Sequence, residues 1–439
     1  MDEGRRVAFL VLRDVEAKGA YVNLSLRAQL SGVAVAHAPF VRELVYGTVR
    51  WKRRLDGILA QFTRAPLEKT QLPVLVLLRM GLYQLLYMDS VPDHAAISQS
   101  VELAKRFARG REGFVNGVLR SAQRMLREGG QQSAPAGHAL LPASAASLAE
   151  AYSFEDWIVE MWLEELGGPG RVERLLAALN ERPRLFLRAN TLLTDAVYLR
   201  DEFVKRGFEA EVVGDSRGRM QFAPTSLVVS GEGVLATELY AEGLFTVQDL
   251  GAQRVAGALG ALPWETVVDV CAAPGGKTAV LAQDMKNVGR IVATDIHANR
   301  VRLIEGEMKR LGITIVEARA RDAREPWPAL AGQADRVLVD APCSGLGTAR
   351  RKPEVKYKPP QPDLPKLQLE ILTAASAFVK EGGVLLYATC TLVKRENEGV
   401  AQGFLDGNSL FEKVGEETLF PDEAGTDGFY YCLMKKNSG

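Results

Sequence analysis

Two cysteines, each placed just after an apolar run, are the residues of this sequence best suited to do chemistry. Cys343 lies in the word DAPCSG after the apolar residues 337–339, and Cys390 lies in the word YATCT after residues 384–386. An apolar run that opens into small and polar residues is typical of a strand that ends in a loop. Catalytic groups gather at the carboxyl ends of the strands in parallel α/β sheets. The two thiols therefore indicate covalent chemistry at one sheet edge.

A third junction of the same kind, residues 267–278 (VVDVCAAPGGKT), indicates a ligand site beside the cysteines. Its glycines, Gly275 and Gly276, would let the backbone approach a ligand, and the helix that begins there would present free N–H groups. The turn lacks the dinucleotide fingerprint G-x-G-x-x-G. Asp295 ends the next expected strand, 20 residues after Gly275, where it could accept hydrogen bonds from two ribose hydroxyls. Asp322 follows the third strand, where it could accept a hydrogen bond from an adenine amino group.

Both features have a plainer interpretation. A glycine turn alone is more often a structural turn, and a single free cysteine is more often a buried core residue. The acid at a matching offset and the two strand-end positions favour a functional site for Cys343 and Cys390. We favour the plainer interpretation for the other two cysteines. Cys271 lines the glycine turn without an obvious task for its thiol, and Cys432 is typical of a late core strand.

The elements that must position these residues alternate between strand and helix from about residue 244 onward. The expected strands are 266–271, 290–294, 314–318, 336–339 and 383–388, and the expected helices are 277–285, 299–311 and 364–379. Alternation of this kind predicts a mostly parallel, doubly wound α/β sheet.

The chain before residue 130 is typical of a helical bundle, because its apolar residues recur at helical spacing. The expected helices are 5–17, 40–62, 74–88, 95–107 and 114–126. The almost wholly apolar stretch 74–88 is expected in the middle of the bundle.

A stretch rich in Gly, Gln, Ser, Ala and Pro follows the expected bundle and is typical of a linker. Beyond it we expect helices near 154–166 and 171–180, then strands at 184–188 and 209–213 with a helix at 196–206 between them. The sequence therefore predicts four segments: a helical domain (1–130), a linker (131–150), an intermediate α+β domain (151–240) and a catalytic α/β domain (241–439).

The charges of the chain are balanced overall but unevenly distributed. The chain has 54 Lys plus Arg against 54 Asp plus Glu, whereas residues 1–130 have 20 against 12, a net charge of +8. The remainder carries −8. This asymmetry indicates a nucleic-acid-facing arm, although a solvated arginine-rich surface explains it equally well.

The number and spacing of the cysteines argue against a disulfide-rich protein and against a zinc protein. Four cysteines in 439 residues do not make a disulfide scaffold, and successive cysteines lie 72, 47 and 42 residues apart, unlike the ligands of a zinc site. The sequence shows no signal-peptide core and no apolar stretch near the roughly twenty residues that a membrane span needs. We therefore expect a metal-free monomer in the reducing cytoplasm, with no membrane partner.

Three sequence words, VCAAPGGKT, DAPCSG and ATCT, together resemble the RNA cytosine-C5 methyltransferases, which use S-adenosylmethionine. Residues 94–105 and 114–120 resemble the NusB family of helical RNA-binding proteins. Over nearly the whole chain, the combination resembles the RsmB/Sun/Fmu family of bacterial 16S rRNA methyltransferases. The resemblance implies a multidomain fold: an all-α NusB-like domain, a small α+β domain and a Rossmann-like S-adenosylmethionine-dependent methyltransferase domain.

The resemblance also implies a role for each residue of the site. Cys390 is the nucleophile that adds to C6 of cytosine, so that C5 can attack the methyl group of the sulfonium. Cys343 serves product release as a base in the elimination, and Asp340 holds the N3 or amino edge of the cytosine. The implied target is the cytosine usually numbered 967 in 16S rRNA. The residues implied to bind S-adenosylmethionine are Cys271, Ala272, Ala273, Pro274, Gly275, Gly276, Lys277, Asp295, Arg300, Asp322 and Asp340.

The residues leave two interpretations open for the substrate side of the site. The cations of segment 350–358 could hold phosphates next to the target base and Tyr357 could stack on a base, but a solvated charged loop is equally favoured. The target base must in any case leave its stack to meet a buried cysteine.

Three functions remain open at this point. The preferred one is methylation of 16S rRNA, either free or in a small-subunit assembly intermediate. The second is the same chemistry on tRNA or another rRNA site. The third is a non-catalytic RNA-binding or antitermination factor with a vestigial methyltransferase fold, against which the intact Asp340, Cys343 and Cys390 argue.

Overall fold

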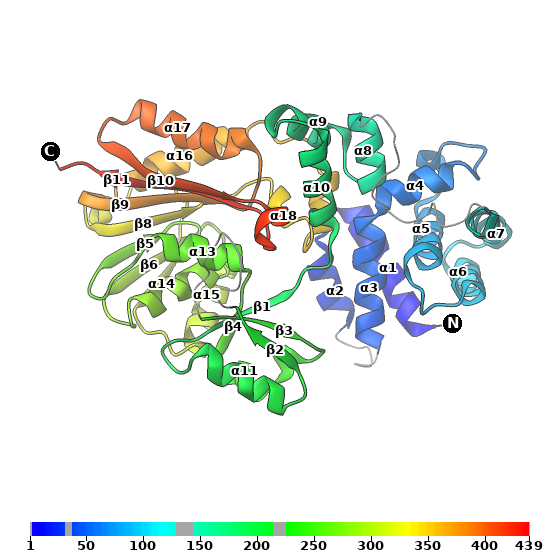
Figure 1. Cartoon of the computed structure of the whole chain (residues 1–439), viewed down its shortest axis with the longest axis horizontal. Coiled ribbons are helices and arrows are strands. Elements are labelled where there is room, and N and C mark those ends of the chain that lie inside the picture. The colour runs from blue at the N-terminus through cyan, green and yellow to red at the C-terminus, as the bar shows by residue number, and fades with distance from the viewer. Residues whose placement is uncertain (1, 31–36, 129–143, 214–224, 439) are drawn as a thin grey trace. The chain divides into compact units, whose positions relative to one another are not determined.

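The computed structural model describes residues 2–30, 37–128, 144–213 and 225–438. The chain folds into two compact units, and each unit is built from two stretches of sequence. Unit 1 comprises Met1–Glu181 and Ala349–Pro359, and unit 2 comprises Arg182–Thr348 and Pro360–Gly439. Figure 1 labels the helices and strands.

Unit 1 is helical, as expected for the first 130 residues. Its helices are α1 (Glu3–Lys18), α2 (Val22–Leu30), α3 (Ala38–Arg50), α4 (Lys52–Ala60), α5 (Leu72–Tyr87), α6 (Asp93–Phe107), α7 (Glu112–Glu128), α8 (Ala145–Tyr152), α9 (Asp156–Glu165) and α10 (Pro169–Asn180). Helix α5 packs against α1, α3, α4, α6 and α7. The prediction that this apolar helix lies in the middle of the bundle is confirmed.

Two expectations for unit 1 need correction. The single helix expected over 40–62 is instead two helices, because the backbone leaves the helical region at Trp51 (φ −104°, ψ 14°). The expected linker 131–150 lies outside the described residues as far as residue 143, and residues 145–150 form most of helix α8 rather than linker.

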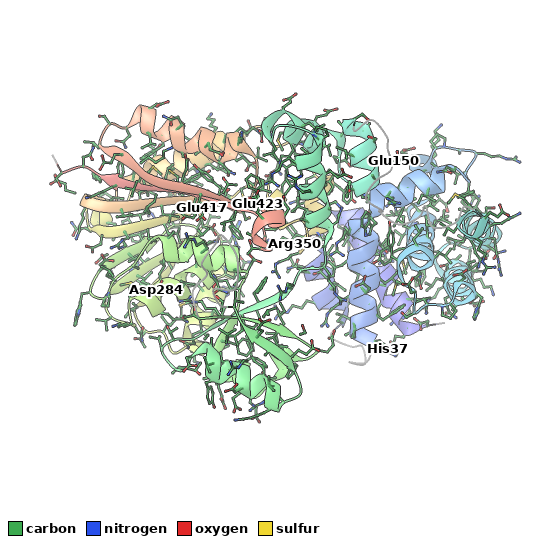
Figure 2. The ribbon with its side chains drawn as sticks, viewed as in Figure 1. His37, Glu150, Asp284, Arg350, Glu417 and Glu423 are labelled. Atoms are coloured by element: carbon green, nitrogen blue, oxygen red, sulfur yellow. The ribbon has the colours of Figure 1, made fainter. Side chains whose placement is uncertain are left out.

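A small antiparallel sheet forms the first part of unit 2. Within the described residues it has the strand order β2–β3–β1–β4, with β1 (Leu185–Ala189), β2 (Glu209–Val212), β3 (Ser226–Ser230) and β4 (Phe245–Val247). Phe203 of helix α11 (Ala196–Lys205) packs against Phe245 with ring centroids 5.4 Å apart. Arg188 of β1 forms an ion pair of 3.1 Å with Asp284, labelled in Figure 2, at the end of helix α14 (Gly276–Asp284).

The larger sheet of unit 2 is mixed and mostly parallel. Its described strands lie in the order β10–β11–β9–β8–β5–β6–β7. Their bounds are β5 (Thr266–Asp269), β6 (Arg290–Asp295), β7 (Val316–Ala320), β8 (Ala334–Asp340), β9 (Val379–Thr389), β10 (Phe411–Leu419) and β11 (Phe429–Lys436). Strands β9, β8, β5, β6 and β7 are parallel neighbours, and β11 and β10 extend the sheet in antiparallel fashion. The predicted α/β sheet is confirmed.

Helices cover both faces of this sheet, so its central strands are apolar on both sides. On one face, α16 (Leu364–Ser376) and α17 (Glu398–Gly407) pack over Val337 and Val339. On the other face, α13 (Leu250–Ala258), α14 and α15 (Ala298–Arg310) pack over residues that include Leu338. The two helical layers are visible on opposite sides of the strands in Figure 1. Across the described ranges, no helix combines the length and the apolar character needed to cross a membrane.

Candidate active site

The carboxyl ends of β5, β8 and β9 bring the three predicted segments to one edge of the sheet. Strand β8 lies between β5 and β9 and is parallel to both, so residues that follow the three strands become neighbours. The clearest result is the distance between the Sγ atoms of Cys343 and Cys390, which is 3.4 Å. The expectation that these two thiols share one sheet edge is therefore met in the structure.

The Cys343 thiol is set up to keep its proton. Its pKa lies well above the usual range, chiefly because of its hydrogen bond with Cys390 and then because of burial. Either sulfur of the pair could be the donor of this hydrogen bond. The arrangement therefore favours a protonated Cys343 thiol in direct contact with Cys390.

A buried ammonium lies beside the cysteines. Lys277 Nζ donates to Asp340 Oδ2 at 2.7 Å. Burial lowers the pKa of Lys277, but the charges of Asp340 and Cys390 outweigh burial, and the net shift is upward. Lys277 is therefore charged, and its electrostatic interaction with Cys390 favours a thiolate there. Asp340, at the end of β8, bonds Lys277 of the glycine turn and lies three residues before Cys343.

Hydrogen bonds around Cys390 fix its loop. Asn397 accepts from Thr389 Oγ1 at 2.6 Å and donates to the carbonyl of Thr391 at 3.1 Å, so it spans Cys390 on both sides. The hydroxyls of Thr391 and Ser344 are 2.7 Å apart, and this contact links the two cysteine loops. The site is thus held together by Asn397 and by side chains of the same two sequence words as the thiols.

The glycine turn opens helix α14 as predicted. Gly275 has φ 106°, a backbone region that side chains disfavour, and a Cβ on it would come within 3.3 Å of Met308. Asp295, at the end of β6, is only 4% exposed and pairs with Arg300 at 2.9 Å. Arg300 also donates to the carbonyl of Ala273 at 2.9 Å, so it joins Asp295 to the turn.

Asp269 is a residue of this site that sequence reasoning missed. It ends β5, is 0% exposed and accepts a hydrogen bond from Thr278 Oγ1 at 2.8 Å. Among the described residues, its second oxygen has no hydrogen-bond partner of normal geometry. Burial raises its pKa to about 7. The sequence signal for this residue was an acid within the segment VVDVC, but the acid was interpreted as an ordinary residue of the strand.

Asp322 lies at the same edge of the sheet as Asp269, but its carboxyl group has a lowered pKa rather than a raised one. The backbone N–H of Arg321 bonds the carbonyl of Asp295 at 3.0 Å, which places the start of this loop beside β6. Both carboxylate oxygens of Asp322 are bound by Arg324, at 3.1 and 2.6 Å, and this hydrogen bonding lowers the pKa of Asp322 to about 2. A hollow of about 940 Å³ opens next to it, lined also by Lys366 and Glu370.

The expectation for segment 350–358 is wrong at two residues. Lys356 is 0% exposed, and its Nζ donates to the carbonyl of Arg50 at 2.7 Å and to Asn180 Oδ1 at 2.8 Å. The Tyr357 hydroxyl lies 3.0 Å from that of Ser153. These side chains are bound inside unit 1, so they are not free to hold phosphates or to stack on a base.

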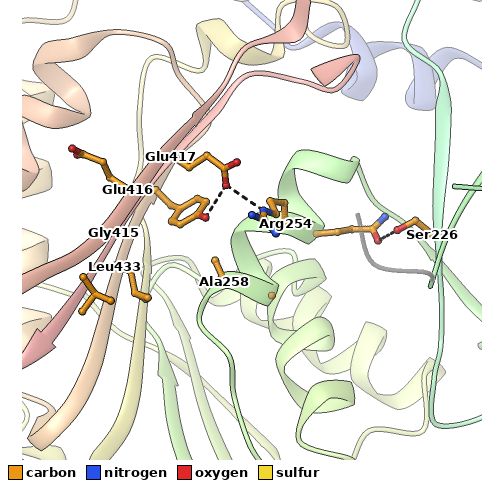
Figure 3. A pocket seen from close by; sticks show the side chains of 11 residues that line it. Ser226, Arg254, Ala258, Gly415, Glu416, Glu417 and Leu433 are labelled. Atoms are coloured by element: carbon orange, nitrogen blue, oxygen red, sulfur yellow. Dashed lines mark hydrogen bonds and ion pairs between the residues drawn. The ribbon is translucent and has the colours of Figure 1, made fainter. Parts of the chain in front are cut away.

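A separate cavity of about 770 Å³ lies between α13 and the strands β10 and β11 (Figure 3). In it, Glu417 accepts from Arg254 at 3.2 Å and from the Tyr431 hydroxyl at 2.7 Å. Its lining contains none of the predicted site residues. Within the described residues, no cluster of His, Cys, Asp and Glu has an arrangement that could hold a metal ion.

Comparison with protein families gives two matches. Residues 257–435 match the family model described as 16S rRNA methyltransferase RsmB/F, and residues 2–124 match the NusB family. These matches agree with the helical and α/β parts of the fold described above.

Full-length relatives carry the comparison further. A Bacillus subtilis protein named probable ribosomal RNA small subunit methyltransferase B is 36% identical and covers 98% of both chains. A Pseudomonas putida ribosomal RNA small subunit methyltransferase B is 32% identical, again over 98% of both. Among solved structures, that of PH0851 has a TM-score of 0.81 and 25% identity, covering 99% of this chain and 98% of its own. A methyltransferase homolog protein from Pyrococcus horikoshii has a TM-score of 0.59 and 26% identity, covering 67% of this chain and 100% of its own.

Proposed function

This chain belongs to the RsmB/F family of rRNA small subunit methyltransferases, and from that premise we propose that it methylates C5 of one cytosine in 16S rRNA. By resemblance, the cytosine is the one usually numbered 967. The observation that carries the cytosine-C5 assignment is the 3.4 Å contact between Cys343 and Cys390 beside the glycine turn. Methylation at C5 needs one group that adds to C6 and another that assists elimination, and the two thiols supply both.

In the proposed reaction, the thiolate of Cys390 adds to C6, and the electron pair of the C5–C6 double bond becomes available at C5. The C5 carbon would then form a bond to the methyl group as the bond between this methyl group and the sulfonium sulfur breaks, which would leave S-adenosylhomocysteine. Lys277 favours the thiolate by its charge, and Asp340 holds the N3 or amino edge of the flipped base. The product retains a C5 proton and a C6–S bond, so both must be removed before the RNA can leave.

Cys343 assists this removal once its own proton is gone. The first cause of its raised pKa is the hydrogen bond with Cys390. When Cys390 is bonded to C6, its sulfur is an uncharged thioether, and this cause disappears. Cys343 can then release its proton to water and accept the proton from C5. The C5–H electron pair reforms the C5–C6 double bond, and Cys390 leaves as thiolate.

The residues present fit S-adenosylmethionine, which supplies the methyl group when bound. Its methionyl ammonium is a cation, and the free oxygen of buried Asp269 is an acceptor suited to it. Asp295 has the buried carboxylate that ribose hydroxyls require, and Asp322 carries the acceptor proposed for adenine. The turn Cys271–Lys277 and Arg300 complete the proposed set, since Arg300 binds both Asp295 and the carbonyl of Ala273.

The decisive experiment is bisulfite sequencing of 16S rRNA after incubation with the protein and S-adenosylmethionine. We expect one newly protected cytosine with the parent protein and none with Cys390→Ala. Transcripts of tRNA in parallel reactions test the substrate class. Protection in tRNA alone would replace the 16S assignment, and no protection in any RNA by a folded protein that binds S-adenosylmethionine would favour a non-catalytic RNA-binding factor.

A further inference from the structure

Two side chains from outside the Cys343 loop hold the peptide groups on either side of this cysteine. Gln368 of helix α16 donates from Nε2 to the carbonyl of Pro342 at 2.9 Å. The N–H of Ser344 donates to Glu396 Oε2 at 2.9 Å. Gln368 and Glu396 also bind each other, Nε2 to Oε2, at 3.0 Å. The loop is therefore bracketed at the residue before Cys343 and at the residue after it.

Both side chains of this bracket are buried. Gln368 is 0% exposed and Glu396 is 1% exposed. A buried carboxylate is costly unless hydrogen bonds satisfy it, and here two donors converge on Oε2. The carbonyl of Glu396 accepts in addition from the buried Tyr387 hydroxyl of β9. The bracket is thus also tied to β9, the strand that precedes Cys390.

We propose that Gln368 and Glu396 are positioning residues for Cys343, and that they act on the release step rather than on the attack step. The inference rests on the proposed function, because it assigns a step to Cys343. Their hydrogen bonds go to the peptide groups on either side of the Cys343 thiol, and the charge of Glu396 also raises the pKa of this thiol. Cys390 is held separately through Asn397, so loss of the bracket leaves the nucleophile in place.

A purely structural role makes a different prediction. If the pair only stabilised the fold, its loss would weaken adduct formation and adduct release together. If it positions Cys343, its loss reproduces the Cys343→Ala phenotype: RNA is attacked and methylated but stays bound through Cys390. The ratio of trapped adduct to released product therefore separates the two roles.

The test uses the full chain and Gln368→Met, which keeps an unbranched side chain of the same length but removes the donor. We expect the fraction of RNA in a denaturation-resistant adduct to rise about tenfold or more, since small misplacements of a reacting group are costly. Glu396→Gln keeps an oxygen for Ser344 and should release product nearly as the parent does. Gln402→Met is the matched control, because Gln402 is exposed on α17 and its amide donates to Asp406 on the same helix, away from both cysteine loops.

A second measurement needs no RNA. Diamide takes the two thiol hydrogens of a close cysteine pair and leaves a disulfide, so the rate of Cys343–Cys390 bond formation reports their spacing. We expect this rate to fall about tenfold in Gln368→Met, in line with the sensitivity of reactions to misplacement, and to stay at the parent value in Gln402→Met. Glu396→Ala removes the other half of the bracket and gives the same comparison should Gln368→Met fail to fold.

The outcomes are distinguishable. Trapped adduct in Cys343→Ala but normal release in folded Gln368→Met would overturn the inference and leave the proposed function standing. No adduct in Cys343→Ala would remove the proposed release role, and the disulfide rate would then decide alone whether the bracket positions the thiol. If Gln368→Met weakens adduct formation and product release equally, then Gln368 and Glu396 have only a structural role.

Discussion

The Sγ atoms of Cys343 and Cys390 lie 3.4 Å apart, although 47 residues separate them in the sequence. The contact unites the ends of two neighbouring parallel strands, β8 and β9. It also raises the pKa of the Cys343 thiol well above the usual range. In the proposed function, Cys390 forms the bond to cytosine and Cys343 handles a proton.

The two cysteines should give opposite phenotypes. Cys390→Ala should transfer no methyl group and form no covalent complex, because no sulfur is left to add to C6. Cys343→Ala should attack and methylate but fail to release, so its RNA should migrate as an adduct on a denaturing gel. Exchange of the two phenotypes would swap the roles, and no adduct with either variant, beside an active parent, would reject the covalent scheme.

Replacement of Asp295 should weaken the binding of S-adenosylmethionine. Asp295→Ala removes a buried carboxylate acceptor, which is worth roughly 1–3 kcal/mol when it bonds a ligand. Titration calorimetry measures the change directly. Arg300→Gln is the comparison variant, because it removes the ion pair together with the contact to Ala273 but keeps the Asp295 carboxylate. Unchanged affinity in a folded Asp295→Ala protein would remove this residue from the cofactor site.

The carboxyl of Asp269 should make stability depend on pH. Burial raises its pKa to about 7, above the value of an unfolded aspartate, so the folded state binds the extra proton between about pH 4 and 7. The stability that this protonation contributes is present at low pH and is lost as the pH rises through 7. The positive charge of Lys277 lowers the pKa of Asp269 and so reduces this loss of stability. The negative charge of Asp340 raises the same pKa and increases the loss.

Asp269→Asn removes this titration. Relative to the parent, the unfolding free energy of the variant should therefore rise between pH 5 and pH 8, by at most about 1.4 kcal/mol per pH unit. Denaturant unfolding of the ligand-free protein at both pH values provides the measurement. A difference between variant and parent that is the same at pH 5 and pH 8 would show that the carboxyl does not titrate in this range.

The basic excess of residues 1–130 should appear in the salt dependence of RNA binding. Arg120 and Arg124 are exposed on α7, and replacing both by Gln should reduce the slope of log affinity against log salt by about 1 per lost phosphate contact. The matched control replaces Arg302 and Lys309, exposed on α15 of unit 2, which changes the charge equally. An unchanged slope in the α7 variant would mean that this surface is only solvated.

Much of the site could be predicted because a parallel sheet gathers its strand ends. The positions of Cys343, Cys390 and Asp295 follow from apolar runs and the residues after them. Cys432 was correctly assigned to a core strand, β11, where it is buried. Strand β10 was missed because FEKVGEETL is largely charged, as suits a strand at the sheet edge.

Other features depend on tertiary contacts that no local pattern records. A run of cations is ordinarily a solvated surface, so nothing in the sequence around Lys356 indicates burial among helices that lie more than 170 residues earlier. The bracket of Gln368 and Glu396 escaped notice for the same reason, because each residue alone is typical of a helix or a turn. Their partners become apparent only when the loops are folded.

Segment Ala349–Pro359 belongs to unit 1, although most of unit 2 precedes it in the sequence. The two units are therefore not consecutive modules of the chain. The chain passes between the units after Glu181, after Thr348 and after Pro359, so neither unit can be produced as one continuous fragment. A fragment that ends at residue 181 lacks Lys356 and leaves the acceptor Asn180 without its donor, a cost of about 1–3 kcal/mol for a buried group. Any single break in the sequence therefore leaves at least one unit incomplete, which favours inheritance of the two units together.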